Sequence, residues 1–109
     1  MNVKLGAVII DAASLETESA FWHRLLGGSL TTTETHHFLR AEGFPVLVIQ
    51  HAAGQAPPEW PDGVSQQLHL DLIAEDLVAA EKLAAESGAR QLSGHVYASP
   101  AGHPFCLRV

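Results

Sequence analysis

The stretch Gln66-Gln67-Leu68-His69-Leu70-Asp71-Leu72-Ile73 decides how this chain folds. Apolar and polar side chains alternate along it with the period of two that is typical of a β-strand. One face carries Leu68, Leu70 and Leu72, and the other carries Gln67, His69 and Asp71. The leucine face needs an apolar cover, whereas the imidazole and carboxylate of the other face must meet water, a ligand or a metal. We therefore predict a strand with one covered face and one open face.

The rest of the chain repeats one order of elements in each half. We predict strands at 3–11, 29–34, 36–41 and 45–51 with a helix from Ser14 to Gly27 in the first half, and strands at 66–73, 89–92, 95–98 and 103–109 with a helix at 76–87 in the second. Leu15 and Phe21 match Leu77 and Leu83 at one offset of about 62 residues, which indicates a tandem motif. The predicted fold class is α+β, with helices on one face of mainly antiparallel sheet.

The chain of 109 residues is long enough for one domain. We place a first module at 1–53, a linker at 54–64 and a second module at 65–109. Pro57, Pro58 and Pro61 favour a loop in the linker. Trp60, which lies within it, is expected to pack against the protein.

Composition excludes several classes of function. The net charge is −6, and six Lys and Arg residues form no basic cluster, which argues against binding to nucleic acid or to an anionic membrane. No apolar run is long enough to span a bilayer. The single cysteine, Cys106, fits a reducing compartment, so we expect a cytoplasmic protein. A weakly polar surface favours a subunit interface.

Strand periodicity also predicts which side chains share the open face. In the last strand Phe105 and Leu107 face the helix, so that Cys106 and Arg108 face away. His69 and Asp71 face away in the same half. In the first half the open face receives Ala7, while period alone does not decide the side on which Gln50 lies. The ligand-pocket candidates are therefore His69, Cys106, Gln50, Ala7, Asp71 and Arg108.

Four stretches together carry a family resemblance. They are Val8–Asp11 with Ala20–Trp22 and Leu25–Gly28; Leu68–Leu72; Asp76–Leu77 with Ala79–Glu81; and Val96–Leu107. In this order they resemble a glyoxalase-like member of the vicinal oxygen chelate (VOC) superfamily, which also holds bleomycin-resistance proteins and extradiol dioxygenases. The resemblance covers nearly the whole chain. It implies two βαβββ modules that curl into a cupped sheet with helices on the outer face, and it implies a homodimer.

The resemblance also implies where a divalent metal would bind. Carried over by position, the ligand places fall on Ala7, Gln50, His69 and Cys106. Ala7 has no donor atom, Gln50 stands where a carboxylate or imidazole is typical, Cys106 stands where a glutamate is usual, and only His69 keeps its type. Two firm ligands fall short of the three or four that a stable site needs. No metal or other cofactor is favoured; a divalent ion held by His69, Cys106 and Gln50 is the alternative.

Each notable side chain also has a plain structural reading. His69 is either a ligand or base, or a polar wall of the pocket. Cys106 is either a thiolate or an inert small side chain, and we favour the second. The pair His36-His37 with Glu34 is read as a solvated hairpin, because adjacent strand residues face opposite ways. Four glutamates are read as solvated helix faces: Glu16, Glu18, Glu81 and Glu86.

Two functions follow from these observations. The first is a glyoxalase-like protein that binds a small organic molecule in the cavity of the cupped sheet, with a depleted metal site. The acidic net charge favours a neutral or cationic ligand. The alternative is a metal-dependent lyase or dioxygenase-type enzyme that uses His69 and its neighbours, so that catalysis is left open.

Overall fold

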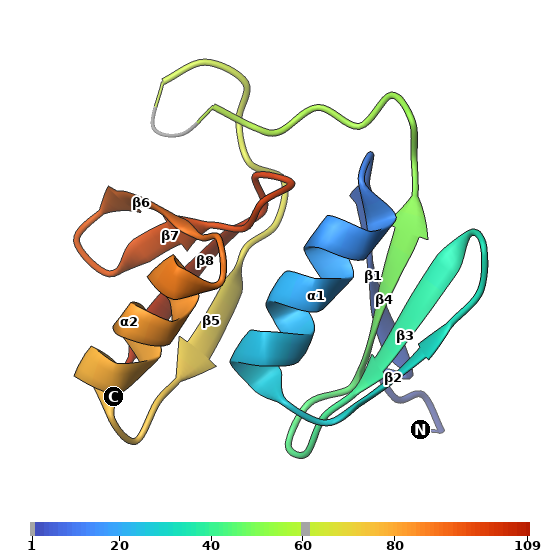
Figure 1. Ribbon diagram of the computed structural model, residues 1–109, viewed down its shortest axis with the longest axis horizontal. Coiled ribbons are helices and arrows are strands. Elements are labelled where there is room, and N and C mark those ends of the chain that lie inside the picture. The colour runs from blue at the N-terminus through green and yellow to red at the C-terminus, as the bar shows by residue number, and fades with distance from the viewer. Residues whose placement is uncertain (1, 60–61) are drawn as a thin grey trace. The chain divides into compact units, whose positions relative to one another are not determined.

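The protein consists of two similar modules, each built from one helix and four strands (Figure 1). The computed structural model describes residues 2–59 and 62–109, so that the predicted packing of Trp60 lies outside the described residues. The first compact unit is Met1–Gln55 and the second is Ala56–Val109. These two units are here called module 1 and module 2.

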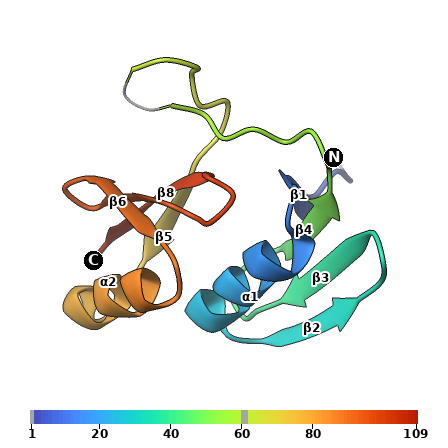
Figure 2. The ribbon, with the colours of Figure 1, turned by 45° about the horizontal axis from the view of Figure 1, so that its top comes forward.

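Module 1 has the order strand, helix and three strands. Its elements are β1 (Ala7–Ala12), α1 (Leu15–Leu26), β2 (Ser29–Thr32), β3 (His36–Arg40) and β4 (Val46–His51). The sheet order is β1-β4-β3-β2, with β1 and β4 parallel and the other two pairs antiparallel. In both ribbon views α1 lies over one face of this sheet, where it contacts β3 and β4 (Figure 2).

Module 2 repeats this arrangement. Its elements are β5 (Leu70–Ile73), α2 (Leu77–Glu86), β6 (Arg90–Ser93), β7 (Val96–Ala98) and β8 (Pro104–Arg108). The sheet order is β5-β8-β7-β6, again with one parallel pair, β5 and β8, and two antiparallel pairs. The predicted α+β class and the tandem βαβββ modules are therefore confirmed.

Local sequence explains where the helices begin and end. The Asp76 carboxylate accepts a hydrogen bond from the backbone N–H of Ala79 at 3.0 Å, and this cap starts α2 at the predicted residue. Ser14 precedes α1 as predicted, but its hydroxyl donates to Thr17 and does not cap the backbone. Gly27 ends α1 with φ at 72°, in the region that glycine adopts without steric cost.

Apolar side chains of each helix pack on one face of the sheet of its own module. In module 1 the buried apolar residues are Ile10, Ala12, Leu15, Phe21, Trp22, Leu39, Leu47, Val48 and Ile49; in module 2 they are Leu72, Ala84, Tyr97, Ala98, Phe105 and Leu107. The face opposite the helix is called the open face of a module. On β1 the exposed residues Ala7, Ile9 and Asp11 alternate with less exposed ones.

The strand over 66–73 is shorter than the alternating pattern predicts. It begins at Leu70, and Leu68 is 63% exposed instead of covered. Its partner strand β8 begins at Pro104, and Leu70 stands beside Phe105. Because proline has no N–H to donate, the ladder cannot extend through Pro104 with its full set of hydrogen bonds.

Candidate functional site

The open face of module 2 carries a hydrogen-bonded row of three predicted site residues. The parallel register of β5 and β8 places Asp71 beside Cys106. Asp71 Oδ1 accepts a hydrogen bond from Cys106 Sγ at 3.0 Å, and Asp71 Oδ2 accepts one from Arg108 Nε at 2.9 Å. The strand register therefore brings Asp71, Cys106 and Arg108 together, and we call them the Asp71 row.

The electrostatics of the Asp71 row fix its protonation. The hydrogen bond from Cys106, followed by the one from Arg108, holds the pKa of the Asp71 carboxyl below its ordinary value. The same hydrogen bond, together with burial, raises the pKa of the Cys106 thiol. The carboxylate is therefore anionic and the thiol stays protonated at neutral pH. Only the thiolate is a good nucleophile, so the protonated Cys106 is unreactive. It acts instead as a weak hydrogen-bond donor to Asp71.

His69 lies at the edge of this row. It directly precedes β5 and is exposed, and its Nδ1 accepts a hydrogen bond from the Gln66 side-chain amide at 3.2 Å in one tautomer. Its nearness to Asp71 contributes to the lowered pKa of that carboxyl. This position agrees with a polar wall beside the Asp71 row.

The open face of module 1 carries a second polar row, which the sequence did not reveal. Gln50 Nε2 donates to Asp11 Oδ1 at 3.4 Å, and Gln50 Oε1 lies 3.1 Å from His36 Nε2. The register places Asp11 and His36 on either side of Gln50 on neighbouring strands. Ala7 stands beside Val46 instead, four residues from the partner of Gln50 and about 13 Å away along the strand.

Apolar side chains surround both rows. Ile9 on β1 is 58% exposed and Ile73 on β5 is 70% exposed, each two residues from the aspartate of its row. Phe38 stacks on His36, with ring centroids 6.1 Å apart. Exposed isoleucines beside partly satisfied polar groups are typical of a surface that binds an organic molecule.

The residues present do not fit the divalent metal that the family resemblance implies. Among residues 2–59 and 62–109, no group of three or more His, Cys, Asp or Glu side chains is placed to hold an ion. Both oxygens of Asp71 already accept hydrogen bonds, and the Gln50 amide is occupied on both sides.

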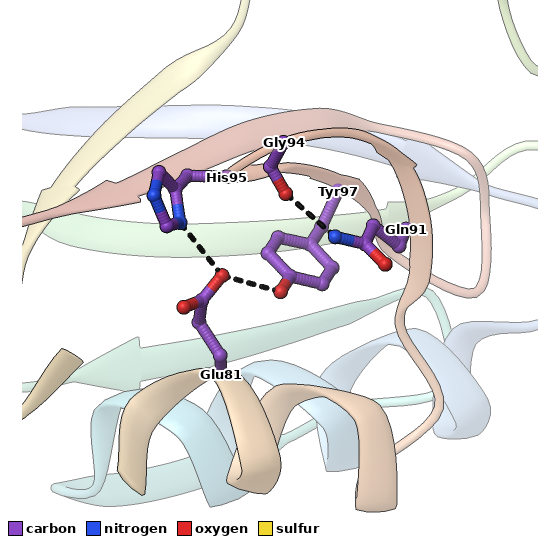
Figure 3. Close-up of polar contacts among 5 residues, drawn as sticks. All are labelled: Glu81, Gln91, Gly94, His95 and Tyr97. Atoms are coloured by element: carbon purple, nitrogen blue, oxygen red, sulfur yellow. Dashed lines mark hydrogen bonds and ion pairs between the residues drawn. The ribbon is translucent and has the colours of Figure 1, made fainter. Parts of the chain in front are cut away.

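Opposite the open face of module 2, a third polar cluster joins α2 to the sheet (Figure 3). Glu81 Oε2 accepts a hydrogen bond from Tyr97 Oη at 2.5 Å and lies 2.9 Å from His95 Nδ1. Burial and the Glu81 carboxylate raise the pKa of Tyr97 to about 12. The hydrogen bonds from Tyr97 and then His95 lower the pKa of Glu81. The reading of Glu81 as a solvated side chain was therefore wrong.

Two further polar residues that were predicted to be solvated are buried where α1 packs on the sheet of module 1. Glu18 is 0% exposed and accepts a hydrogen bond from Trp22 Nε1 at 2.8 Å. His37 is 6% exposed, and its Nδ1 lies 2.6 Å from Ser19 Oγ. The adjacent His36 faces the other side, as the alternation of a strand requires. Because Glu18 has a hydrogen bond from Trp22 and His37 has one with Ser19, both polar side chains are accommodated in the interior of module 1.

Comparisons with known proteins agree with this fold. Residues 7–108 match the family model of the glyoxalase-like domain, which confirms the resemblance seen in the sequence. No curated protein sequence matches the chain. No helix in the part of the chain that the structure describes is long and apolar enough to cross a membrane.

Solved structures similar to the chain share its fold at low sequence identity. A glyoxalase/bleomycin resistance protein/dioxygenase family enzyme from Burkholderia phytofirmans has a TM-score of 0.77 at 13% identity, covering 96% of this chain and 97% of that one. The fosfomycin resistance protein FosX from Mesorhizobium loti has a TM-score of 0.72 at 11% identity, with coverage of 98% and 91%. A glyoxalase/bleomycin resistance protein from Albidiferax ferrireducens has a TM-score of 0.70 at 14% identity, with coverage of 94% and 96%.

Proposed function

This chain belongs to the glyoxalase-like domain family, and from that premise we propose that it binds a small organic molecule on the open faces of its sheets. The observation that carries the proposal is the Asp71 row beside an isoleucine that is 70% exposed. This arrangement offers an anionic acceptor and a guanidinium next to an apolar surface. It supplies orientation through polar groups and affinity through apolar contact, as small-molecule sites do.

The charge of the protein favours a neutral or cationic ligand. The net charge is −6, and the Arg108 guanidinium, the cation of this row, is paired with Asp71. An anionic ligand would have to compete with that carboxylate for the guanidinium. A cationic ligand would compete with Arg108 for a carboxylate that is ionised because its pKa is lowered, but the net charge of −6 attracts a cation and repels an anion.

Calorimetric titration with two antibiotics tests this proposal. Bleomycin is cationic and fosfomycin is anionic, and each appears in the name of a structural relative. We expect bleomycin to bind and Asp71→Asn to weaken its binding roughly tenfold, the effect of one charged hydrogen bond. Glu86→Gln is the matched control, because it removes one negative charge from an exposed part of α2. Equal weakening by both variants, or no binding of bleomycin, would refute the proposal.

The same protein sample tests the alternative of a metal-dependent lyase or dioxygenase-type enzyme. Elemental analysis of the purified protein measures bound zinc, nickel, manganese and iron. A stoichiometric metal that is lost in His69→Ala would overturn the reading of a depleted site. We expect no such metal, since Asp71 and Gln50 are already occupied by protein partners.

We also propose that the protein forms a homodimer in the cytoplasm. The support is its family membership, the apolar residues exposed on its surface and its single cysteine. Light scattering of the purified protein measures the mass in solution, and fractionation of the source cells measures the compartment. A monomer at high protein concentration would contradict the first statement.

A further inference from the structure

A cleft of about 410 Å³ lies at the far end of the open face of module 2. It is lined by Pro57, Pro58, Glu59, Asp62, Arg90, Leu92, Ala98, Gly102 and Pro104. Ala98 and Pro104 form its floor, two residues along β7 and β8 from Val96 and Cys106. Its volume falls within the range of small-molecule sites.

The segment Pro57–Glu59, here called the strap, forms one wall of this cleft. Gly102 permits its close approach, because a Cβ added at Gly102 would stand 2.1 Å from Pro57 Cβ. The backbone N–H of Glu59 donates to the carbonyl oxygen of Val64 at 2.8 Å, which closes the loop that follows the strap. The floor residues Ala98 and Pro104 are consequently buried, although they lie on the open face. The strap belongs to the same compact unit as the sheet beneath it.

Three charged side chains line the cleft without neutralising one another. Arg90 comes from β6, whereas Glu59 and Asp62 come from the strap and the loop beyond it. Within the part of the chain that the structure describes, none of these side chains makes an ion pair or hydrogen bond. Arg108, by contrast, is paired on the same face. Arg90, Glu59 and Asp62 therefore line the cleft with no partner for their charged groups among the described residues.

The uncharged part of the lining is apolar and stiff. Pro57, Pro58, Pro104, Leu92 and Ala98 contribute no side-chain hydrogen-bonding group. Proline side chains lose little conformational entropy when a ligand packs on them. An apolar body of a ligand is therefore accommodated between the charged positions.

We infer that this cleft binds a small zwitterion that has an apolar body, with its anionic group at Arg90 and its ammonium group at Glu59 and Asp62. A planar guanidinium pairs a carboxylate through two parallel hydrogen bonds, and carboxylates accept the three donors of an ammonium. This inference goes beyond the proposed function, because the cleft lies on the open face of module 2 but is separate from the Asp71 row that carries that proposal. It names the chemistry of the ligand from residues that the family resemblance does not single out.

Three compounds with one phenyl body separate the two charges. L-Phenylalanine carries both groups, phenethylamine carries the ammonium alone, and 3-phenylpropanoate carries the carboxylate alone. Chemical-shift titration of the isotope-labelled protein measures each affinity and reports which residues respond. We expect L-phenylalanine to bind roughly threefold to tenfold tighter than either relative, which is the effect of one ion pair that water still reaches. The responding backbone amides are expected on β6, β7 and the strap.

Variants assign each charge. Arg90→Gln is expected to reduce L-phenylalanine binding to the level of phenethylamine and to leave phenethylamine unchanged. Glu59→Gln with Asp62→Asn is expected to weaken phenethylamine and to leave 3-phenylpropanoate unchanged or tighter. Lys82→Gln is the matched control, since it removes one positive charge from an exposed part of α2, away from the cleft and from the Asp71 row.

The outcomes separate this inference from the proposed function. Equal affinity for the three compounds, absence of shifts around the cleft, or indifference to Arg90→Gln overturns the zwitterion site. If bleomycin binding still depends on Asp71 in that case, the proposed function stands without the inference. If the three compounds rank as expected while no antibiotic responds to Asp71→Asn, the site in the cleft stands and the proposed role of the Asp71 row fails.

Discussion

Tyr97 offers the most direct measurement of the polar contacts that join α2 to its sheet. Its hydroxyl donates to Glu81 at 2.5 Å, and the residue is 6% exposed (Figure 3). Burial disfavours tyrosinate, and the adjacent carboxylate disfavours it further, so that the pKa of Tyr97 rises from 10.0 to about 12. The perturbation is Glu81→Gln, which removes the negative charge and keeps a side chain of the same length.

The size of the effect follows from the linkage between pKa and stability. The pKa of Tyr97 rises from 10.0 to about 12, and each pKa unit corresponds to about 1.36 kcal/mol. The folded protein therefore loses at most about 2.7 kcal/mol of stability when Tyr97 ionises. Burial is the larger cause of the raised pKa, so the part of this stabilisation that Glu81→Gln removes is the smaller one. The pKa is raised in the folded state, so this stabilisation is fully present below pH 10. It is lost as pH rises from about 10 through about 12.

The assay is unusually clean because the chain has one tyrosine. The near-ultraviolet absorbance of tyrosinate, followed against pH in the folded protein, reports the pKa of Tyr97 alone. We expect the pKa to fall in Glu81→Gln but to remain above 10, since burial is the larger cause. Tyr97→Phe, studied by urea unfolding, is expected to remove the alkaline decline of the free energy of unfolding. Half-ionisation near pH 10 in the folded wild-type protein would refute the reasoning, as would an unchanged pKa in Glu81→Gln.

Three further predictions concern other contacts. Asp71→Asn is expected to lower the pKa of Cys106. A disulfide reagent should therefore modify this single cysteine faster at mildly alkaline pH. An unchanged rate would contradict the hydrogen bond between Cys106 and Asp71. Trp22→Phe removes a hydrogen bond to a buried carboxylate, and urea unfolding is expected to show a loss of about 2 to 4 kcal/mol. Gly102→Ala is expected to destabilise module 2 by at least about 1 kcal/mol more than Gly94→Ala in thermal unfolding. Both glycines have positive φ, but no atom lies within 4 Å of a Cβ built at Gly94. Equal losses of stability in the two variants would mean that the strap does not lie against Gly102.

Periodicity and capping residues were sufficient to predict the order of elements. The cap at Asp76 and the stop at Gly27 are local signals, because each acts through backbone atoms within a few residues. The beginnings of the strands were less predictable. A strand forms only beside a partner strand. The alternation that starts at Gln66 does not show that Phe105, the partner of Leu70, follows directly after Pro104.

Burial of single polar residues was harder still. Glu18 lies on the same side of α1 as Trp22, one turn away, so an i,i+4 pair was visible in the sequence. A glutamate at such a position usually faces water, and only the packing of α1 on β3 and β4 places this one inside. The same packing buries His37, whose partner Ser19 is 18 residues away in sequence.

The candidate site shows why faces were predictable and neighbours were not. Alternation assigns Asp71, Cys106 and Arg108 to one face, and that assignment needs only the strand period. Which residues touch depends on register, and register is a property of two strands together. Gln50 illustrates the difference. A carry-over by position placed it with Ala7, whereas the pairing of β1 with β4 sets it beside Asp11, so that its amide bridges Asp11 and His36. An amide committed to two neighbours is a rigid feature of a binding surface. An ion would have to displace these hydrogen bonds, and among the described residues no group of three or more His, Cys, Asp or Glu side chains is placed to hold one.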